Sequence, residues 1–211
     1  MTTLVRDTYP RRTNLGADGD GADFQCRLTA KWKAVGAEQV RFVDTPRSFI
    51  VLIKAGNNVF INYRGTWTDL QTLNNGLFLP QIRFFALPGF VRVHPGWHLS
   101  FLESFDQVVS ILTNNFSCTG ACQITLVGHS RGAALANYAA ATLSNSYANL
   151  GSVTGVYTYG GVRPGNSAYQ NAWNRKFKTI TYNWWNRLDW VPNQPFIFYR
   201  QSPRLKMGNS T

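Results

Sequence analysis

The segment that most constrains this chain is a Gly-His-Ser-Arg-Gly pentapeptide at residues 128–132, with Ser130 at its centre. Residues 123–127 before it are mostly aliphatic or β-branched and carry no charge, which is typical of a strand buried on both faces of a sheet. Residues 133–143 after it are rich in alanine and contain neither Gly nor Pro, which predicts a helix. A strand, a tight turn and a helix therefore meet at Ser130.

A turn of this kind favours a particular chemistry. A sharp turn that forces a serine into a strained conformation needs neighbours without side chains, and Gly128 and Gly132 meet that need. The following helix would aim its first amides at the serine, where they stabilise developing negative charge. We interpret the pentapeptide as a nucleophile elbow, the alternative being a purely structural turn.

The length and composition indicate one domain over residues 1–211, because 211 residues with 44% hydrophobic content support a sizeable core and no linker divides them. Residues 1–22 are largely polar, and we expect them to be flexible. The start has no apolar core of signal-peptide length, and no apolar run is long enough to span a bilayer. The default expectation is a cytoplasmic protein.

The charge balance is strongly positive: 21 Lys and Arg against 10 Asp and Glu give a formal net charge of +11. The charges are scattered, and no nucleic-acid-binding module accompanies them, so we expect no nucleic-acid partner and favour attraction to a membrane surface or simple solubility. Cys26, Cys118 and Cys122 form no metal-ligand pattern, and we expect neither metal nor cofactor. Cys118 and Cys122 either close a small loop or are separate thiols.

The order of the expected elements defines an α/β fold. Three strands in residues 39–63 form an antiparallel meander, residues 67–92 form a long irregular excursion, and apolar spacing from Leu102 to Leu112 predicts a helix over 99–116. After the elbow, we expect a strand at 153–159, a helix at 167–175 and a strand at 179–184. The predicted architecture is α/β hydrolase-like: a largely parallel central sheet with antiparallel N-terminal strands and helices on both faces.

A serine nucleophile needs a base, a carboxylate that orients the base, and donors for the oxyanion. Asp189 follows a predicted strand in a half of the chain with few acids, and we expect it to be the orienting carboxylate; the alternatives are an ion pair with Arg187 or a turn cap. Thr66 and the backbone amide of Arg131 would form the oxyanion hole. For Thr66 the alternative is a local helix or turn cap.

The whole chain resembles a known family. The segments at 63–66, 93–97, 128–132, 157–166 and 189–192 follow one another as the motifs of the class 3 lipases, the fungal triacylglycerol lipase family, do. The resemblance implies an esterase acting on acylglycerols or related lipid esters, with Ser130 as nucleophile, Asp189 as triad acid, Thr66 as oxyanion side chain and residues 67–92 as a lid. It also implies that His94 scaffolds the site without supplying the base.

The chain departs from the family in three places. Arg131 and Val162 stand where the family has Leu and Pro, and no histidine follows His129, although the family places its catalytic histidine last. We expect His129 to be a packing group beside the nucleophile; His94 or His98 would serve as base only in a non-standard order. The simpler hypothesis is that the chain stops before the segment with the base, which predicts a nearly inactive chain.

Two rival functions accompany the hydrolase hypothesis. A catalytically dead lipase-fold protein would bind lipid or a protein partner, and a binder of anionic polymers would rely on charge alone. Aromatic side chains in and near the lid candidate suit a lipid interface, although such residues also serve as core. These residues are Phe78, Phe84, Phe85, Phe90 and Trp97.

Overall fold

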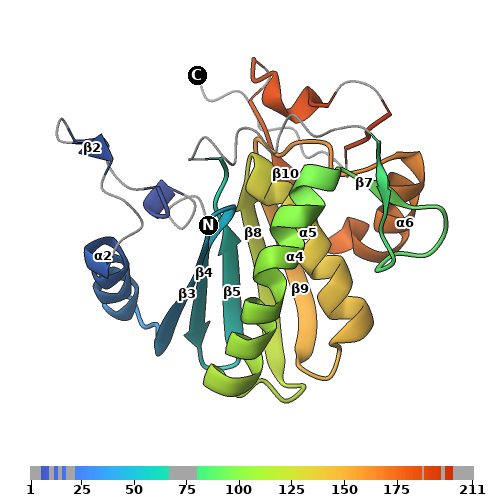
Figure 1. Ribbon diagram of the computed structural model, residues 1–211. Coiled ribbons are helices and arrows are strands. Elements are labelled where there is room, and N and C mark those ends of the chain that lie inside the picture. The colour runs from blue at the N-terminus through green and yellow to red at the C-terminus, as the bar shows by residue number, and fades with distance from the viewer. Residues whose placement is uncertain are drawn as a thin grey trace.

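A six-stranded mixed sheet forms the centre of the protein, as the computed structural model shows (Figure 1). The strand order is β10-β9-β8-β5-β4-β3, with β3, β4 and β5 antiparallel and β5, β8, β9 and β10 parallel. The strands are β3 (Gln39–Thr45), β4 (Ser48–Ala55), β5 (Asn58–Tyr63), β8 (Cys122–His129), β9 (Gly151–Tyr159) and β10 (Thr181–Trp184). The structure describes residues 6–9, 12–13, 16–17, 22–66, 80–186, 188–195 and 198–201.

Helices cover both faces of this sheet, as the sequence predicts. One face carries α4 (Pro95–Ser110), which continues as a π-helical turn over Ile111–Asn115, together with α5 (Arg131–Ser146). The other face carries α2 (Ala22–Lys33), whose Phe24 and Leu28 pack on β3 and β4. The predicted α/β hydrolase-like fold is therefore confirmed.

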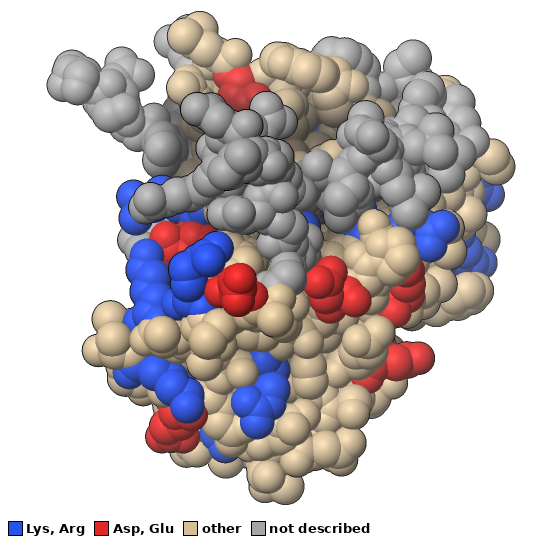
Figure 2. All heavy atoms as spheres, turned by 60° about the vertical axis from the view of Figure 1, so that its left-hand side comes forward, with Lys and Arg blue, Asp and Glu red and all other residues tan. Residues whose placement is uncertain are grey.

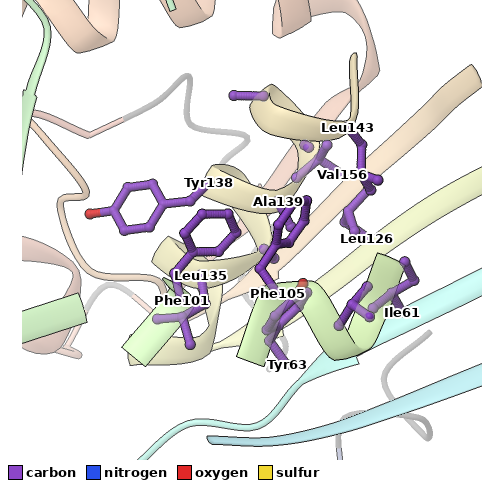
Figure 3. Close-up of a cluster of buried hydrophobic side chains, with 14 of the residues drawn as sticks. Ile61, Tyr63, Phe101, Phe105, Leu126, Leu135, Tyr138, Ala139, Leu143 and Val156 are labelled. Atoms are coloured by element: carbon purple, nitrogen blue, oxygen red, sulfur yellow. The ribbon is translucent and has the colours of Figure 1, made fainter. Parts of the chain in front are cut away.

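The main core lies between the sheet and the two long helices. Phe101 and Phe105 of α4 meet Leu135 and Tyr138 of α5 above the strands, and all four side chains are buried (Figure 3). The small residues of α5 let it approach β8 closely, which explains why the alanine-rich helix is almost entirely buried. This packing fixes the start of α5, where Ser130 lies.

Two details of the expected elements were wrong. The helix predicted from residue 99 begins at Pro95, because His94 caps it and proline is favoured in the first turn. Leu102 was placed on the buried face, yet its side chain is 53% exposed, and Trp97 and Phe101 are buried instead. Helix α2 was not predicted, since charged and polar residues outnumber its two buried positions.

The remaining elements are short. Helix α6 (Ser167–Phe177) leads through a 3-10 turn at Lys178–Ile180 into β10, and a second 3-10 turn spans Val191–Asn193. Two small hairpins are formed by β1 (Arg12–Thr13) with β2 (Gly16–Ala17), and by β6 (Ile82–Arg83) with β7 (Arg92–Val93). Cys118 and Cys122 form a disulfide, which settles the alternative left open by the sequence, and Cys26 is an exposed free thiol.

The predicted lid at residues 67–92 lies partly outside the described residues, which resume at Pro80. Its described part is the β6–β7 hairpin. Phe84 there is buried against Tyr138 and Tyr169, so this residue belongs to the core, as does Trp97; Phe78 lies outside the described residues. Phe85 and Phe90, in contrast, are 79% and 78% exposed.

Candidate active site

Ser130 occupies the turn between β8 and α5, at the edge of the sheet where the parallel strands end. Its backbone angles are φ 54° and ψ −124°, a conformation that residues with side chains seldom adopt. Such a conformation costs about 1–3 kcal/mol and persists only where the surrounding structure enforces it. This is the strained turn that the nucleophile-elbow interpretation requires.

Close backbone packing enforces the turn. A Cβ atom on Gly128 would lie 2.4 Å from the carbonyl oxygen of Gly132. A side chain at residue 128 would therefore keep β8 and α5 from packing this closely against each other. The amide of Ser130 donates a hydrogen bond of 2.9 Å to the carbonyl oxygen of Tyr159, at the end of the neighbouring strand β9. The conformation of the serine is thus held from both sides.

The expected oxyanion loop lies directly against this turn. A Cβ atom on Gly65 would lie 3.1 Å from Cβ of Ser130 and 2.8 Å from the carbonyl oxygen of His129. Thr66 follows Gly65 and is partly exposed, and the amide of Arg131 belongs to the first residue of α5. The structure therefore brings the loop of Thr66 and the first amide of α5 to the same serine.

The side chain of Arg131 is buried. Its Nη1 donates to the hydroxyl of Ser100 at 3.1 Å and its Nη2 to the carbonyl oxygen of Arg47 at 2.6 Å. Burial is the main reason why the pKa of this guanidinium is lowered to about 10; Tyr9 and Glu103 oppose the shift, and the charge of Arg64 adds to it. The arginine that replaces the family's leucine thus binds α4 and the β3–β4 turn.

Asp189 follows β10 and enters the same region. One carboxylate oxygen, Oδ1, accepts a hydrogen bond of 3.0 Å from the amide of Val191, so the turn cap considered from the sequence is present. The other oxygen, Oδ2, lies 3.0 Å from the place where a Cβ atom on Gly160 would stand, and Nε2 of His129 lies 3.9 Å from the same place. Asp189 therefore both caps its turn and faces the end of β9 beside His129; Arg187 lies outside the described residues.

The three histidines have separate environments. His94 is fully buried, its Nδ1 accepts a 3.3 Å hydrogen bond from the amide of Trp97, and its ring stacks on the Trp97 ring. His98 packs among Phe84, Phe101 and Tyr138, and burial lowers its pKa. Within the described residues, no histidine forms a hydrogen bond with Ser130.

One residue at the site was not predicted. The hydroxyl of Tyr9 lies 2.7 Å from Nδ1 of His129 and accepts a 2.8 Å hydrogen bond from the amide of Gly65. Tyr9 lies in a polar segment that we expect from the sequence to be flexible. No motif or periodicity near it indicates a residue of the site. Only the folded arrangement reveals the contact.

Among the residues that the structure describes, no group of His, Cys, Asp and Glu is placed to hold a metal ion. No helix in the same part of the chain has the length and apolar character needed to cross a membrane.

The sheet order and the strained serine after a buried strand define an α/β hydrolase. The chain belongs to the class 3 lipase family, because the model of that family, "Lipase (class 3)", matches residues 60–199.

Comparisons with individual proteins agree with this assignment. The chain is 28% identical over 117 residues to secreted mono- and diacylglycerol lipase 3 of Gibberella zeae, a match that covers 56% of this chain and 37% of the relative. Among solved structures, the triacylglyceride lipase of Rhizomucor miehei has a TM-score of 0.63 at 19% identity, with 80% of this chain and 67% of that chain covered. Lip2 lipase of Yarrowia lipolytica also gives 0.63 at 19%, with 82% and 67% covered. The chain spans little more than a third of the curated relative, so the activity of the whole protein is a matter for proposal.

Proposed function

We propose that the protein is a serine ester hydrolase that acts on acylglycerols or related lipid esters. Ser130 attacks the ester carbonyl, and the amides of Thr66 and Arg131 hold the oxyanion that forms. Asp189 is the carboxylate that would orient a histidine base for Ser130, although none of the described histidines forms a hydrogen bond with the serine. The strained backbone of Ser130, packed against the loop of Gly65, is the observation that carries this proposal.

The geometry favours a slow reaction for the chain of 211 residues. Nδ1 of His129 contacts Tyr9, while His94 and His98 lie in aromatic surroundings. Losing the triad histidine costs on the order of 10⁶ in kcat in subtilisin, with roughly 10³ over water remaining from the oxyanion hole and binding. We therefore expect weak, Ser130-dependent hydrolysis.

Hydrolysis of p-nitrophenyl butyrate and of a monoacylglycerol by the purified chain tests the proposal. Ser130→Ala should remove the activity, whereas Ser152→Ala, at an exposed position of β9, should leave it unchanged. Activity that survives in Ser130→Ala would show that another group is responsible.

The second candidate is a lipase-fold protein that binds lipid or a protein partner without catalysis. The aromatic packing of His94 and His98 favours it, because both rings pack against partners other than Ser130. A folded protein that binds lipid equally well as wild type and as Ser130→Ala, with no hydrolysis by either, would support this candidate.

The surface that contacts lipid is proposed to be the aromatic tip of the β6–β7 hairpin, made of Arg83, Phe85 and Phe90. The guanidinium carbon of Arg83 lies 5.3 Å from the ring centre of each phenylalanine, and both rings are largely exposed. Residues 80–93 contain two arginines and no acid. Exposed aromatic rings beside cations suit the headgroup region of a membrane with anionic lipids.

The described charged side chains outside the hairpin do not form a single basic patch on the face that Figure 2 shows. Basic and acidic side chains are interspersed on that face. Some opposite charges are paired, as Arg47 is with Glu103 at 3.1 Å. That arrangement gives little support to a polymer binder driven by charge alone.

A further inference from the structure

The hydroxyl of Tyr9 connects two loops of the candidate site that are distant in sequence. It accepts the amide hydrogen of Gly65, next to Thr66, at 2.8 Å, and it lies 2.7 Å from Nδ1 of His129, next to Ser130. A Cβ atom on Gly65 would stand 2.5 Å from this hydroxyl, so the loop approaches Tyr9 as closely as its backbone allows.

The segment that carries Tyr9 is itself anchored. Asp7 forms an ion pair of 2.6 Å with Lys31 of α2, and the side-chain amide of Asn62 in β5 donates a buried hydrogen bond of 3.1 Å to the hydroxyl of Thr8. These contacts attach the segment to the second helical layer and to the strand that leads into Gly65. The position of Tyr9 is thus set by contacts of the two residues that precede it.

The direction of each hydrogen bond follows from the protonation of the groups. Burial raises the pKa of Tyr9 to about 12, so the phenol keeps its proton near neutral pH. Since the Gly65 amide donates to the phenol oxygen, the phenol proton is available for Nδ1 of His129. Burial also lowers the pKa of His129, which favours a neutral ring. If the phenol donates to Nδ1, the one hydrogen of that neutral ring lies on Nε2.

The other ring nitrogen of His129 lies near the same glycine as Asp189. Nε2 of His129 and Oδ2 of Asp189 are 3.9 Å and 3.0 Å from the place of a Cβ atom on Gly160. The charge of Asp189 raises the pKa of His129, in opposition to the larger effect of burial. With Nδ1 accepting and Nε2 protonated, His129 has no lone pair left to take the proton of Ser130.

We propose that Tyr9 is a positioning residue of the active site: its hydroxyl holds the Gly65–Thr66 loop against the Ser130 turn and fixes the Nε2–H tautomer of His129 toward Asp189. This inference rests on the proposed function, in which that loop supplies the oxyanion donors. Donors placed before the reaction cost no reorganisation when charge develops, so a fixed loop has catalytic value.

Tyr9→Phe is the variant that tests this role, because it removes the hydroxyl and keeps the ring, whose edge-on contact with His129 has a centroid distance of 5.5 Å. A structural role of the ring alone would survive this change. Tyr147→Phe is the matched control: Tyr147 lies at the far end of α5, where its ring contacts Phe105.

The first measurement is NMR of protein labelled uniformly with ¹⁵N, with the His129 ring signals assigned through His129→Gln. Wild type and Tyr147→Phe should show Nε2–H as the dominant tautomer of His129, and Tyr9→Phe should move the population toward Nδ1–H and shift the amide signal of Gly65. A thermal unfolding curve for each variant checks that it is folded. An unchanged tautomer and an unchanged Gly65 amide in folded Tyr9→Phe would overturn the proposal.

The second measurement is the rate at which a fluorophosphonate labels Ser130. Tyr9→Phe should slow labelling about tenfold, the effect of losing roughly one hydrogen bond from the reacting geometry. If the wild type is not labelled, the proposed function fails, while the tautomer measurement still decides the role of Tyr9. If labelling occurs and Tyr9→Phe labels at the wild-type rate, the positioning role is wrong.

Discussion

Gly132, at the start of α5, packs against Tyr63, at the end of β5, so closely that a Cβ atom on Gly132 would lie 2.1 Å from the carbonyl oxygen of Tyr63. No flexible side chain can move aside to relieve this contact, because the obstructing atom belongs to the backbone. The distance between the oxyanion loop and the nucleophile turn is therefore set by this glycine.

Gly132→Ala should separate α5 from β5 and destabilise the fold by more than about 4 kcal/mol, the range of severe packing defects. Gly36→Ala is the control, because Gly36 has φ +98° and open space around its Cβ position, so it should cost only about 1 kcal/mol of backbone strain. Urea unfolding measures both. Equal losses in the two variants would contradict the packing argument.

The buried histidines predict a pH dependence of stability. The pKa values of His98 and His129 are both lowered from 6.5, mainly by burial, so the unfolded chain binds protons before the folded one does. Their contribution to stability is present above pH 6.5 and is lost as the pH falls below that value, at most about 1.4 kcal/mol per pH unit for each histidine. Unfolding free energies measured from pH 7.5 to 5 should fall less steeply in His129→Gln than in wild type or in the exposed control Gln107→Asn. Identical slopes would show that His129 is not held neutral.

The hairpin tip predicts selective binding to anionic lipid. Phe85→Ser with Phe90→Ser should weaken binding to vesicles of phosphatidylcholine and phosphatidylglycerol more than tenfold, since each ring loses apolar burial worth on the order of 1.5 kcal/mol or more. Arg83→Gln should reduce the preference for anionic over neutral vesicles. The control, Val35→Ser with Leu102→Ser, changes two other exposed apolar side chains. If both double variants bind alike in vesicle sedimentation, the hairpin is not the lipid contact.

The disulfide between Cys118 and Cys122 predicts how many thiols are free to react. Protein purified without reductant should show one thiol reactive to Ellman's reagent, that of Cys26, and Cys26→Ser should show none. Reduction should lower the unfolding free energy by about 2 kcal/mol, the entropy of so short a loop. Reactive thiols at all three cysteines before reduction would contradict the bond.

The fold was predictable because its signals are local. The residues of a segment predict its secondary structure in three places: the uncharged strand before Ser130, the alanine-rich helix after it, and the strands that alternate with helices in the second half. The structure confirms each of these elements. The sequence does not predict the start of α4, because its N-cap is His94 and not one of the residues that usually cap helices.

The site was predictable only in part, for a physical reason. The candidate site residues all follow strands of the sheet, and the topology places the ends of these strands near one another. The order of elements in the sequence therefore predicts that these residues lie close together: Thr66, Ser130, Arg131 and Asp189. Tyr9 reaches His129 across 120 positions from a segment with no periodicity, and such a contact leaves no local pattern. The same holds for the side chain of Arg131, whose partners lie on α4 and the β3–β4 turn.

The claim that Ser130 is the nucleophile of a serine hydrolase is tested most directly by prolonged labelling with a fluorophosphonate, followed by mass spectrometry of the peptides. If Ser130 is the nucleophile, an adduct forms slowly on Ser130, is absent in Ser130→Ala and is unaffected by Ser152→Ala. A folded protein that forms no adduct on Ser130, or forms it on another serine, would contradict this role and favour a binding protein on the lipase fold.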